Sequence, residues 1–241
     1  MTTNLLSAIR TQLTPAIVHH LSSLVSESPV NTQQAVDEVL PTLLTGVIRL
    51  SSSGDGPARL VDLINHRNYE RLLNNLSGLF DKGNTAKALI ASGQDILRTV
   101  FAGKLSAVSA LIAHTTHITN ASASVLLSLT APLVVGTLGR VRAAHGLNAI
   151  GLSTLLLDQR DTIAEHAPAG LADVLELNSR SGLDTPFAHA ATAIGPNEEA
   201  WKAWKNKGNR SGRPPWWLLL LGIVALSVVY WLWGRGPGSA L

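Results

Sequence analysis

The sequence predicts an all-α protein, a multi-helix bundle followed by a single C-terminal transmembrane helix. Nearly every segment before residue 178 places apolar residues three and four positions apart, and no segment alternates apolar and polar residues as a half-buried strand does. Residues 216–233 contain no Asp, Glu, Lys, Arg or His. As a helix they would span about 27 Å, close to the roughly 30 Å of hydrocarbon in a bilayer.

Caps and prolines mark the first helices. A short first helix carries the apolar residues at 5, 6, 9 and 13. Thr14 is a good N-cap, and Pro15 suits the first position of a second helix. We expect a third helix to open at Asn31 or Thr32. It should be kinked or divided at Pro41, because proline removes a backbone donor and clashes with the preceding turn.

The later helices follow from apolar spacing alone. We expect a loop over residues 51–56, a final amphipathic pair over 151–177, and helices between them that start at Pro57 and cover residues 72–80, 86–91 and 96–101. Residues 105–139 contain no Asp, Glu, Lys or Arg. Two fully buried core helices explain this stretch better than a membrane segment, because His114, Asn120 and Pro132 would be costly in hydrocarbon. The alternative makes this stretch membrane-active, as in pore-forming helical bundles.

The two halves of the N-terminal part match loosely at an offset of 91 residues. The match pairs Pro41-Thr-Leu-Leu with Pro132-Leu-Val-Val, Ala58 with Ala149, and Ile64 with Leu155. A duplicated helical unit would produce this match, and so would chance similarity between leucine-rich helices.

Composition divides the chain into five parts. They are a helical cytoplasmic domain (1–177), a linker (178–197), a basic juxtamembrane segment (198–215), the transmembrane helix (216–233) and a short external tail (234–241). Residues 1–196 hold 13 Lys/Arg and 14 Asp/Glu, a net charge of −1, whereas residues 197–241 hold 6 and 2, a net charge of +4. The basicity therefore favours lipid headgroups over nucleic acid.

Aromatic and basic residues around the predicted anchor assign its contacts and direction. The membrane-anchoring residues are Trp216, Trp217, Tyr230, Trp231 and Trp233. The headgroup-contacting residues are Trp201, Lys202, Trp204, Lys205, Lys207, Arg210 and Arg213, on a short interfacial helix or, alternatively, a disordered basic spacer. Because the Lys/Arg excess precedes the helix, we expect a single-pass protein of the bacterial inner membrane with its N-terminal domain in the cytoplasm.

Two groups of side chains could carry chemistry. His114 and His117 are three positions apart and could share one helix face as zinc ligands. Asp158, Asp161 and Glu165, with His166 beside them, could bind a divalent cation or act as acid and base. The ordinary explanations are histidines with local hydrogen bonds and a solvated acidic face. Without cysteine the chain has no disulfide or thiolate metal site, and its glycines form no phosphate-binding loop.

Residues 151–177, together with Val36–Leu44 around Pro41 and Leu126–Leu138 around Pro132, resemble the YidB-like bacterial family, domain of unknown function 937 (DUF937). The resemblance covers residues 5–177 and implies an all-helical bacterial domain with no assigned activity. Some members are similar in continuing through a membrane helix into an OmpA-like domain that binds peptidoglycan. Whether such a domain follows residue 241 is left open.

The favoured function is a membrane-tethered helical interaction or scaffold module of the cell envelope, with no catalysis and no cofactor. The expected partners are the lipid bilayer and an unknown protein, which could be a second copy of the chain, and no nucleic acid. The alternative is a membrane-surface enzyme that uses the Asp158–His166 face, or His114 and His117, with a divalent metal.

Overall fold

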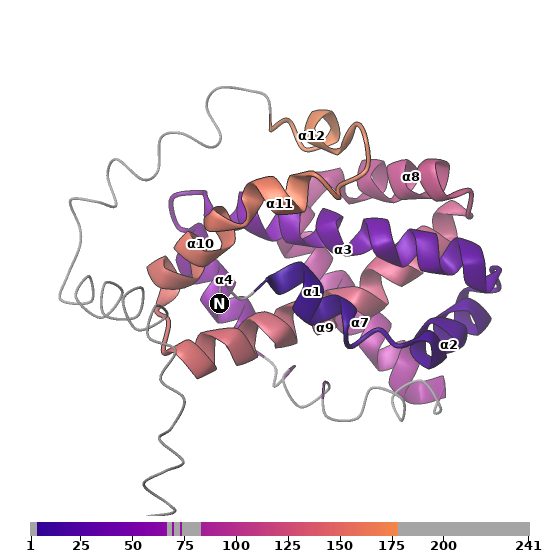
Figure 1. Cartoon of the computed structure of the whole chain (residues 1–241), viewed down its shortest axis with the longest axis horizontal. Helices are drawn as coiled ribbons and strands as arrows, with labels where there is room; N and C mark the ends of the chain where they lie inside the picture. The colour runs from indigo at the N-terminus through magenta and orange to yellow at the C-terminus, as the bar shows by residue number, and fades with distance from the viewer. Residues whose placement is uncertain (1–3, 67–68, 70–72, 74–82, 178–241) are drawn as a thin grey trace, which may run out of the picture. The chain divides into compact units, whose positions relative to one another are not determined.

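A computed structural model describes residues 4–66, 69, 73 and 83–177, and within these residues every regular element is a helix (Figure 1). The elements are α1 (Leu5–Arg10), α2 (Pro15–Val25), α3 (Pro29–Ser51), α4 (Gly56–His66), α7 (Gly83–Phe101), the 3₁₀ turn η1 (Ala102–Lys104), α8 (Leu105–Thr116), α9 (Asn120–His145), α10 (Ala149–Asp158), α11 (Arg160–Ala164) and α12 (Leu171–Val174). The all-α prediction is confirmed for this part of the chain.

Several predicted segments lie outside the described residues. The linker, the basic juxtamembrane segment, the transmembrane helix and the tail are among them, together with every membrane-anchoring and headgroup-contacting residue named above. The predicted helix over residues 72–80 also lies outside, except for residue 73.

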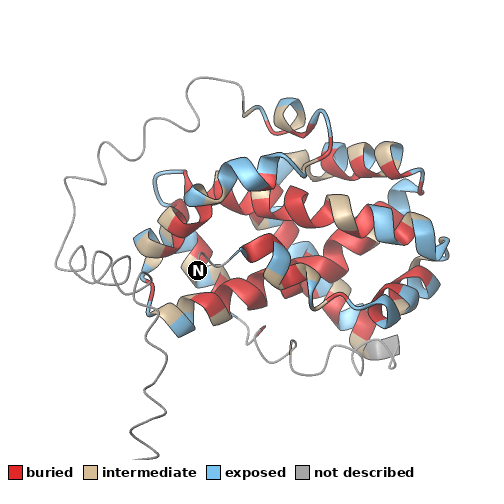
Figure 2. Ribbon diagram, in the orientation of Figure 1, coloured by how far each residue is buried: buried red, intermediate tan, exposed pale blue. Residues whose placement is uncertain are grey.

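Two long helices, α3 and α9, form the centre of the described fold. They pack against each other, and each of α1, α2, α4, α7 and α8 contacts both of them. Figure 2 shows the consequence, because buried residues fill the central helices and exposed residues face outward. The apolar side chains of α3 and α9 therefore supply most of the shared surface on which the shorter helices are placed.

Side-chain caps set where the early helices begin. The predicted N-cap Thr14 is confirmed, since its side chain accepts from the backbone N–H of Ile17. The predicted start of the third helix at Asn31 or Thr32 is wrong. Ser28 is the N-cap, and its hydroxyl accepts from the N–H of Asn31 at 3.1 Å. Pro29 then takes the first position, where its missing N–H costs nothing.

The sequence predicts a kink or a division at Pro41, and the division is wrong, because α3 continues through this residue. Pro41 is buried, and the two threonines near it donate their hydroxyls to helix carbonyls: Thr42 to Glu38 at 2.7 Å and Thr45 to Pro41 at 2.8 Å. Proline removes one backbone hydrogen bond, with a net value of about 1 kcal/mol. Packing along the rest of the helix outweighs that loss.

The short helices predicted at residues 86–91 and 96–101 are one helix, α7. Gly93 lies between them and marks the place where α7 meets α9. A Cβ at Gly93 would lie 1.7 Å from the carbonyl oxygen of Ser128. The glycine therefore does not interrupt the helix. It lets the two backbones touch.

Residues 105–139 are only partly as predicted. Most of α9 is buried, but α8 buries only Val108, Ser109, Ile112 and Thr116, and exposes small residues such as Ala107 and Ala110. The prediction that both helices are fully buried is therefore wrong for α8. By length and composition, Thr85–Thr116 and Asn120–His145 could each cross a membrane, with 39% and 83% of their most apolar windows buried. The burial of α9 is what a core helix requires.

The predicted repeat is confirmed by the turns between helices. Ser26 ends α2 and His117 ends α8, both in the left-handed region, with φ of 56° and 55° and ψ of 38° in each. The N–H of the next residue then bonds to the carbonyl of Ser22 at 3.1 Å in the first turn, and to that of Ala113 at 3.2 Å in the second. These are matching positions at the offset of 91.

The helices after these turns match as well. Ser28 caps α3, and Thr119 caps α9 in the same way, by accepting from the N–H three residues later. Pro41 and Pro132 then lie inside the two helices. The equivalent helices α4 and α10 also pack against each other, as α3 and α9 do. The described residues therefore contain the same helical unit twice, at residues 4–66 and 95–157. The equivalent helices of the two units, α3 with α9 and α4 with α10, contact each other.

One carboxylate joins the two units. An oxygen of Glu27 accepts from the backbone N–H of Thr119 at 3.0 Å, at the start of α9. This hydrogen bond is the main reason that the pKa of Glu27 lies below its ordinary value of 4.5, and a bond from the Ser122 hydroxyl adds to it. A negative charge at a helix N-terminus is stabilised by the helix dipole.

We predict that Gly93→Ala destabilises the protein by about 1–3 kcal/mol, because the new methyl group forces α7 and α9 apart. Urea unfolding of the full chain in a neutral detergent, followed by circular dichroism, measures the change. Gly103→Ala is the matched control, since nothing lies within 4 Å of a Cβ there. Equal stability of the two variants would contradict the close crossing.

We predict that Glu27→Gln lowers stability near neutral pH by about 0.3–1 kcal/mol. A lowered folded-state pKa means that the contribution is complete above pH 4.5 and is lost as the pH falls through the folded-state value. The difference from the unaltered chain should therefore shrink in acid. Glu165→Gln, at an exposed position, serves as the control. A difference that stays constant down to about pH 3 would contradict the role of the charge.

Candidate functional site

The predicted histidine pair does not share a helix face. His114 is exposed in the last turn of α8, whereas His117 is the C-cap in the left-handed conformation. The helix ends at Thr116, so the chain has already turned when it reaches the second imidazole. The three-residue spacing would align the two rings only if the helix continued.

The predicted acidic face is divided between two helices. Asp158 is the last residue of α10, and Asp161 belongs to α11. Gln159 lies between the helices, and its side-chain oxygen accepts from the N–H of Leu5 at 2.8 Å, at the start of α1. Asp158, Asp161, Glu165 and His166 are all exposed, and they surround no cavity among those that the structure describes.

Local partners account for two of these four side chains. Asp161 pairs with the adjacent Arg160 at 3.3 Å, and Nδ1 of His166 lies 2.9 Å from the carbonyl oxygen of Thr162. Across residues 4–66, 69, 73 and 83–177, no three His, Asp or Glu side chains converge as ligands for a metal. The geometry thus gives no support to the metal-dependent alternative.

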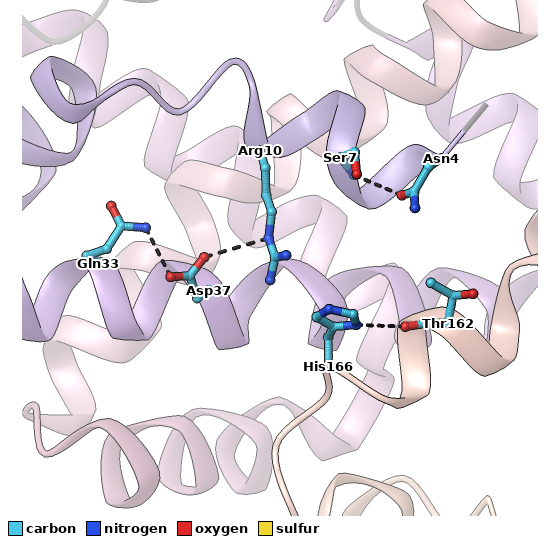
Figure 3. A network of polar contacts seen from close by, with 7 residues as sticks. All are labelled: Asn4, Ser7, Arg10, Gln33, Asp37, Thr162 and His166. Carbon is cyan, nitrogen blue, oxygen red and sulfur yellow. Dashed lines mark hydrogen bonds and ion pairs between the residues drawn. The ribbon is translucent and has the colours of Figure 1, made fainter. Parts of the chain in front are cut away.

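A small polar network lies where α1 and α3 meet, with His166 drawn nearby (Figure 3). Nε of Arg10 lies 3.7 Å from one oxygen of Asp37, and the amide of Gln33 donates to the other at 3.1 Å. The side chains of Arg10 and Asp37 are 37% and 47% exposed. A pair this exposed contributes less than about 1 kcal/mol. We assign the network to holding α1 on α3.

The stronger candidate site is an open cleft of about 430 Å³ between α4 and α7. Its lining comprises Arg59, Asp62, Leu63, His66, Tyr69, Asp95, Ile96 and Thr99. Small-molecule and peptide sites commonly have volumes of about 300–1,000 Å³. Unlike the predicted sites, this one gathers ionisable side chains from separate helices around a single hollow.

Helical spacing and one buried hydrogen bond arrange the lining. Arg59, Asp62 and His66 stand at i, i+3 and i+7 and share one face of α4. At the far end, the hydroxyl of Tyr69 lies 2.9 Å from that of Ser92, and both residues are buried. Tyr69 follows α4 and Ser92 lies on α7, so this hydrogen bond joins the chain just after α4 to α7 beside the cleft.

The cleft carries side chains of both charges. Arg59, Asp62 and His66 line it from α4, and Asp95 lines it from α7. Asp95 also pairs with Arg98 at 2.7 Å. Within the part of the chain that the structure describes, the side chains of Arg59, Asp62 and His66 make no hydrogen bond or ion pair.

The repeat shows that these ionisable residues are not needed by the shared fold. Four of them have counterparts at the offset of 91 that are not ionisable. The pairs are Arg59 with Ile150, Asp62 with Ser153, His66 with Leu157, and Asp95 with Asn4, whereas Tyr69 pairs with Arg160. The apolar residues around them are kept, since Ile96, Leu97 and Val100 are buried like Leu5, Leu6 and Ile9. The core is shared by the two units. The charged cleft lies between α4 of the first unit and α7 of the second, and its equivalent between α10 and α1 lacks these charges.

Sequence reasoning did not identify the cleft. Polar residues at i, i+3 and i+7 are common on solvated helix faces, so α4 gives no distinctive motif. The informative signal was the repeat itself, in which charged Arg59 aligns with apolar Ile150.

Comparison with known proteins gives one positive result. A family described as "Bacterial protein of unknown function (DUF937)" has a model that matches residues 7–141. The match covers α1 to most of α9. No curated protein matches the chain, and no solved structure matches it.

We predict that Tyr69→Phe and Ser92→Ala each destabilise the protein by about 1 kcal/mol, because each leaves a buried hydroxyl unpaired. The double variant should cost less than the sum of the two. Urea unfolding of the four proteins forms a double-mutant cycle that measures the coupling. Strictly additive losses of stability would show that the two hydroxyls are not coupled and would contradict this hydrogen bond.

Proposed function

The chain belongs to the DUF937 family of bacterial proteins of unknown function, and on that premise we propose that it is a membrane-tethered helical interaction module of the cell envelope. The helical domain would face the cytoplasm and bind a protein partner, while residues 216–233 anchor it in the inner membrane. The proposal assigns the domain no catalytic step and no cofactor.

One observation carries the interaction role. Ionisable residues from α4 and α7 line an open cleft, and the positions on α10 equivalent to Arg59, Asp62 and His66 carry no ionisable side chain. Charged groups that the fold does not need, in a cleft open to solvent, are suited to recognising a partner. The residues that would have supplied metal or acid–base chemistry are exposed and dispersed.

The sequence beyond the described residues supports the tether. Residues 216–233 have the length and the lack of charge that a bilayer span requires, with Trp and Tyr at both ends. Five Lys and Arg residues between 202 and 213 precede them, and only Arg235 follows. This excess favours a cytoplasmic N-terminal domain, and the lysines, with Trp201 and Trp204, would contact anionic headgroups.

We predict that the full chain stays with bacterial membranes through an alkaline carbonate wash. Replacing both Ala225 and Leu226 with Arg should release much of it, because each charge at the centre of a span costs about 2.5–3.5 kcal/mol. Ala225→Leu is the matched control and should stay bound. Release of the unaltered chain, or retention of the double arginine variant, would contradict the anchor.

The direction of the chain can be tested with the same preparations. The protein has no cysteine, so single cysteines at Ser181 and Ser239 report the two sides of the anchor. A membrane-impermeant maleimide added to cells with a permeabilised outer membrane should label Ser239→Cys and spare Ser181→Cys. The opposite labelling would overturn the proposed orientation.

A further inference from the structure

We infer that the α4/α7 cleft receives an amphipathic helix of a partner protein, with a Lys or Arg side chain of the partner at Asp62 and an Asp or Glu side chain at Arg59. The inference rests on the proposed interaction role and not on the membrane tether. It specifies the chemistry that the partner must present.

The charges of the cleft carry the first step. Arg59 and Asp62 are three residues apart on α4, about 4.5 Å along the helix axis, and do not pair with each other. Within residues 4–66, 69, 73 and 83–177 neither side chain has an ion-pair partner, and both line the cleft. A partner that places a cation beside Asp62 and an anion beside Arg59 satisfies both, and a partner with one sign of charge repels one of them.

The shape of the cleft carries the second step. Its lining comes from α4 between Arg59 and His66, from Tyr69 just after α4, and from α7 between Asp95 and Thr99, so it is a hollow between two helices. The charged side chains remain exposed along about 10 Å of α4, whereas small-molecule sites enclose most of the ligand. Leu63 and Ile96 supply apolar contact on opposite walls. This is the arrangement used to recognise a helix lying in a groove.

The repeat carries the third step. At the equivalent place between α10 and α1, Ile150 and Ser153 replace Arg59 and Asp62. The packing that the two copies share therefore does not require these charges, and they are available for recognition.

The test uses dye-labelled, alanine-based helical peptides and the full chain in a neutral detergent. The parent peptide carries one Leu and a Glu and a Lys four residues apart. Matched peptides replace Lys with Gln, or Glu with Gln, or both. Fluorescence anisotropy measures binding to the unaltered chain and to Asp62→Asn and Arg59→Gln.

The parent peptide should bind, and either single neutral replacement should weaken it about two- to fivefold. With the Asp62→Asn chain, replacing the peptide's Lys should no longer weaken binding, whereas replacing its Glu should still weaken it. Arg59→Gln should do the reverse. Asp161→Asn, an exposed carboxylate outside the cleft, should change neither.

Three results would overturn the inference. They are no binding of the parent peptide, equal binding of the fully neutral peptide, and the same loss in Asp161→Asn as in Asp62→Asn. If the chain stays bound in carbonate but gives any of these results, the membrane anchor stands and the proposed cleft site is wrong. If carbonate releases the chain but both charge couplings are observed, the cleft site stands and the membrane anchor is wrong.

Discussion

The described structure depends on the packing of α3 against α9. Each is long, largely buried and continuous through an internal proline. Five further helices touch both, so their positions follow from this one crossing. Two glycines bring α7 into it: Gly93 touches the backbone of α9, and Gly46 of α3 leaves room for Phe101. Close backbone approach of this kind fixes helix positions more tightly than apolar side chains alone.

The repeat explains why the residues that build the fold differ from the residues that line the candidate site. The duplicated turns, caps and buried positions are retained in both units because each must pack against its copy. Surface positions were free to differ. Around the α4/α7 cleft they differ in charge, and Arg59, Asp62 and His66 have uncharged counterparts. Comparing two copies within one chain thus distinguishes residues kept for packing from residues available for binding.

Much of the fold could be predicted from the sequence, and the candidate site could not. Helical spacing and a capping threonine at residue 14 identified real elements, because they act within a few residues of chain. The errors at Pro41 and Gly93 arose because distant contacts decide whether such residues break a helix. Spacing placed His117 on a helix that ends one residue earlier, and it could not show that α4 and α7 enclose a cleft. The membrane anchor lies outside the described residues and stays a prediction.

Photo-crosslinking in living bacteria tests the central claim, recognition through the α4/α7 cleft, most directly. A photoreactive amino acid would replace Leu63 in the cleft or Thr154, its counterpart 91 residues later. The account predicts a discrete crosslinked product from position 63, none from position 154, and loss of the product when Asp62→Asn is added. The same products from both positions, or a product that persists without the carboxylate, would contradict it.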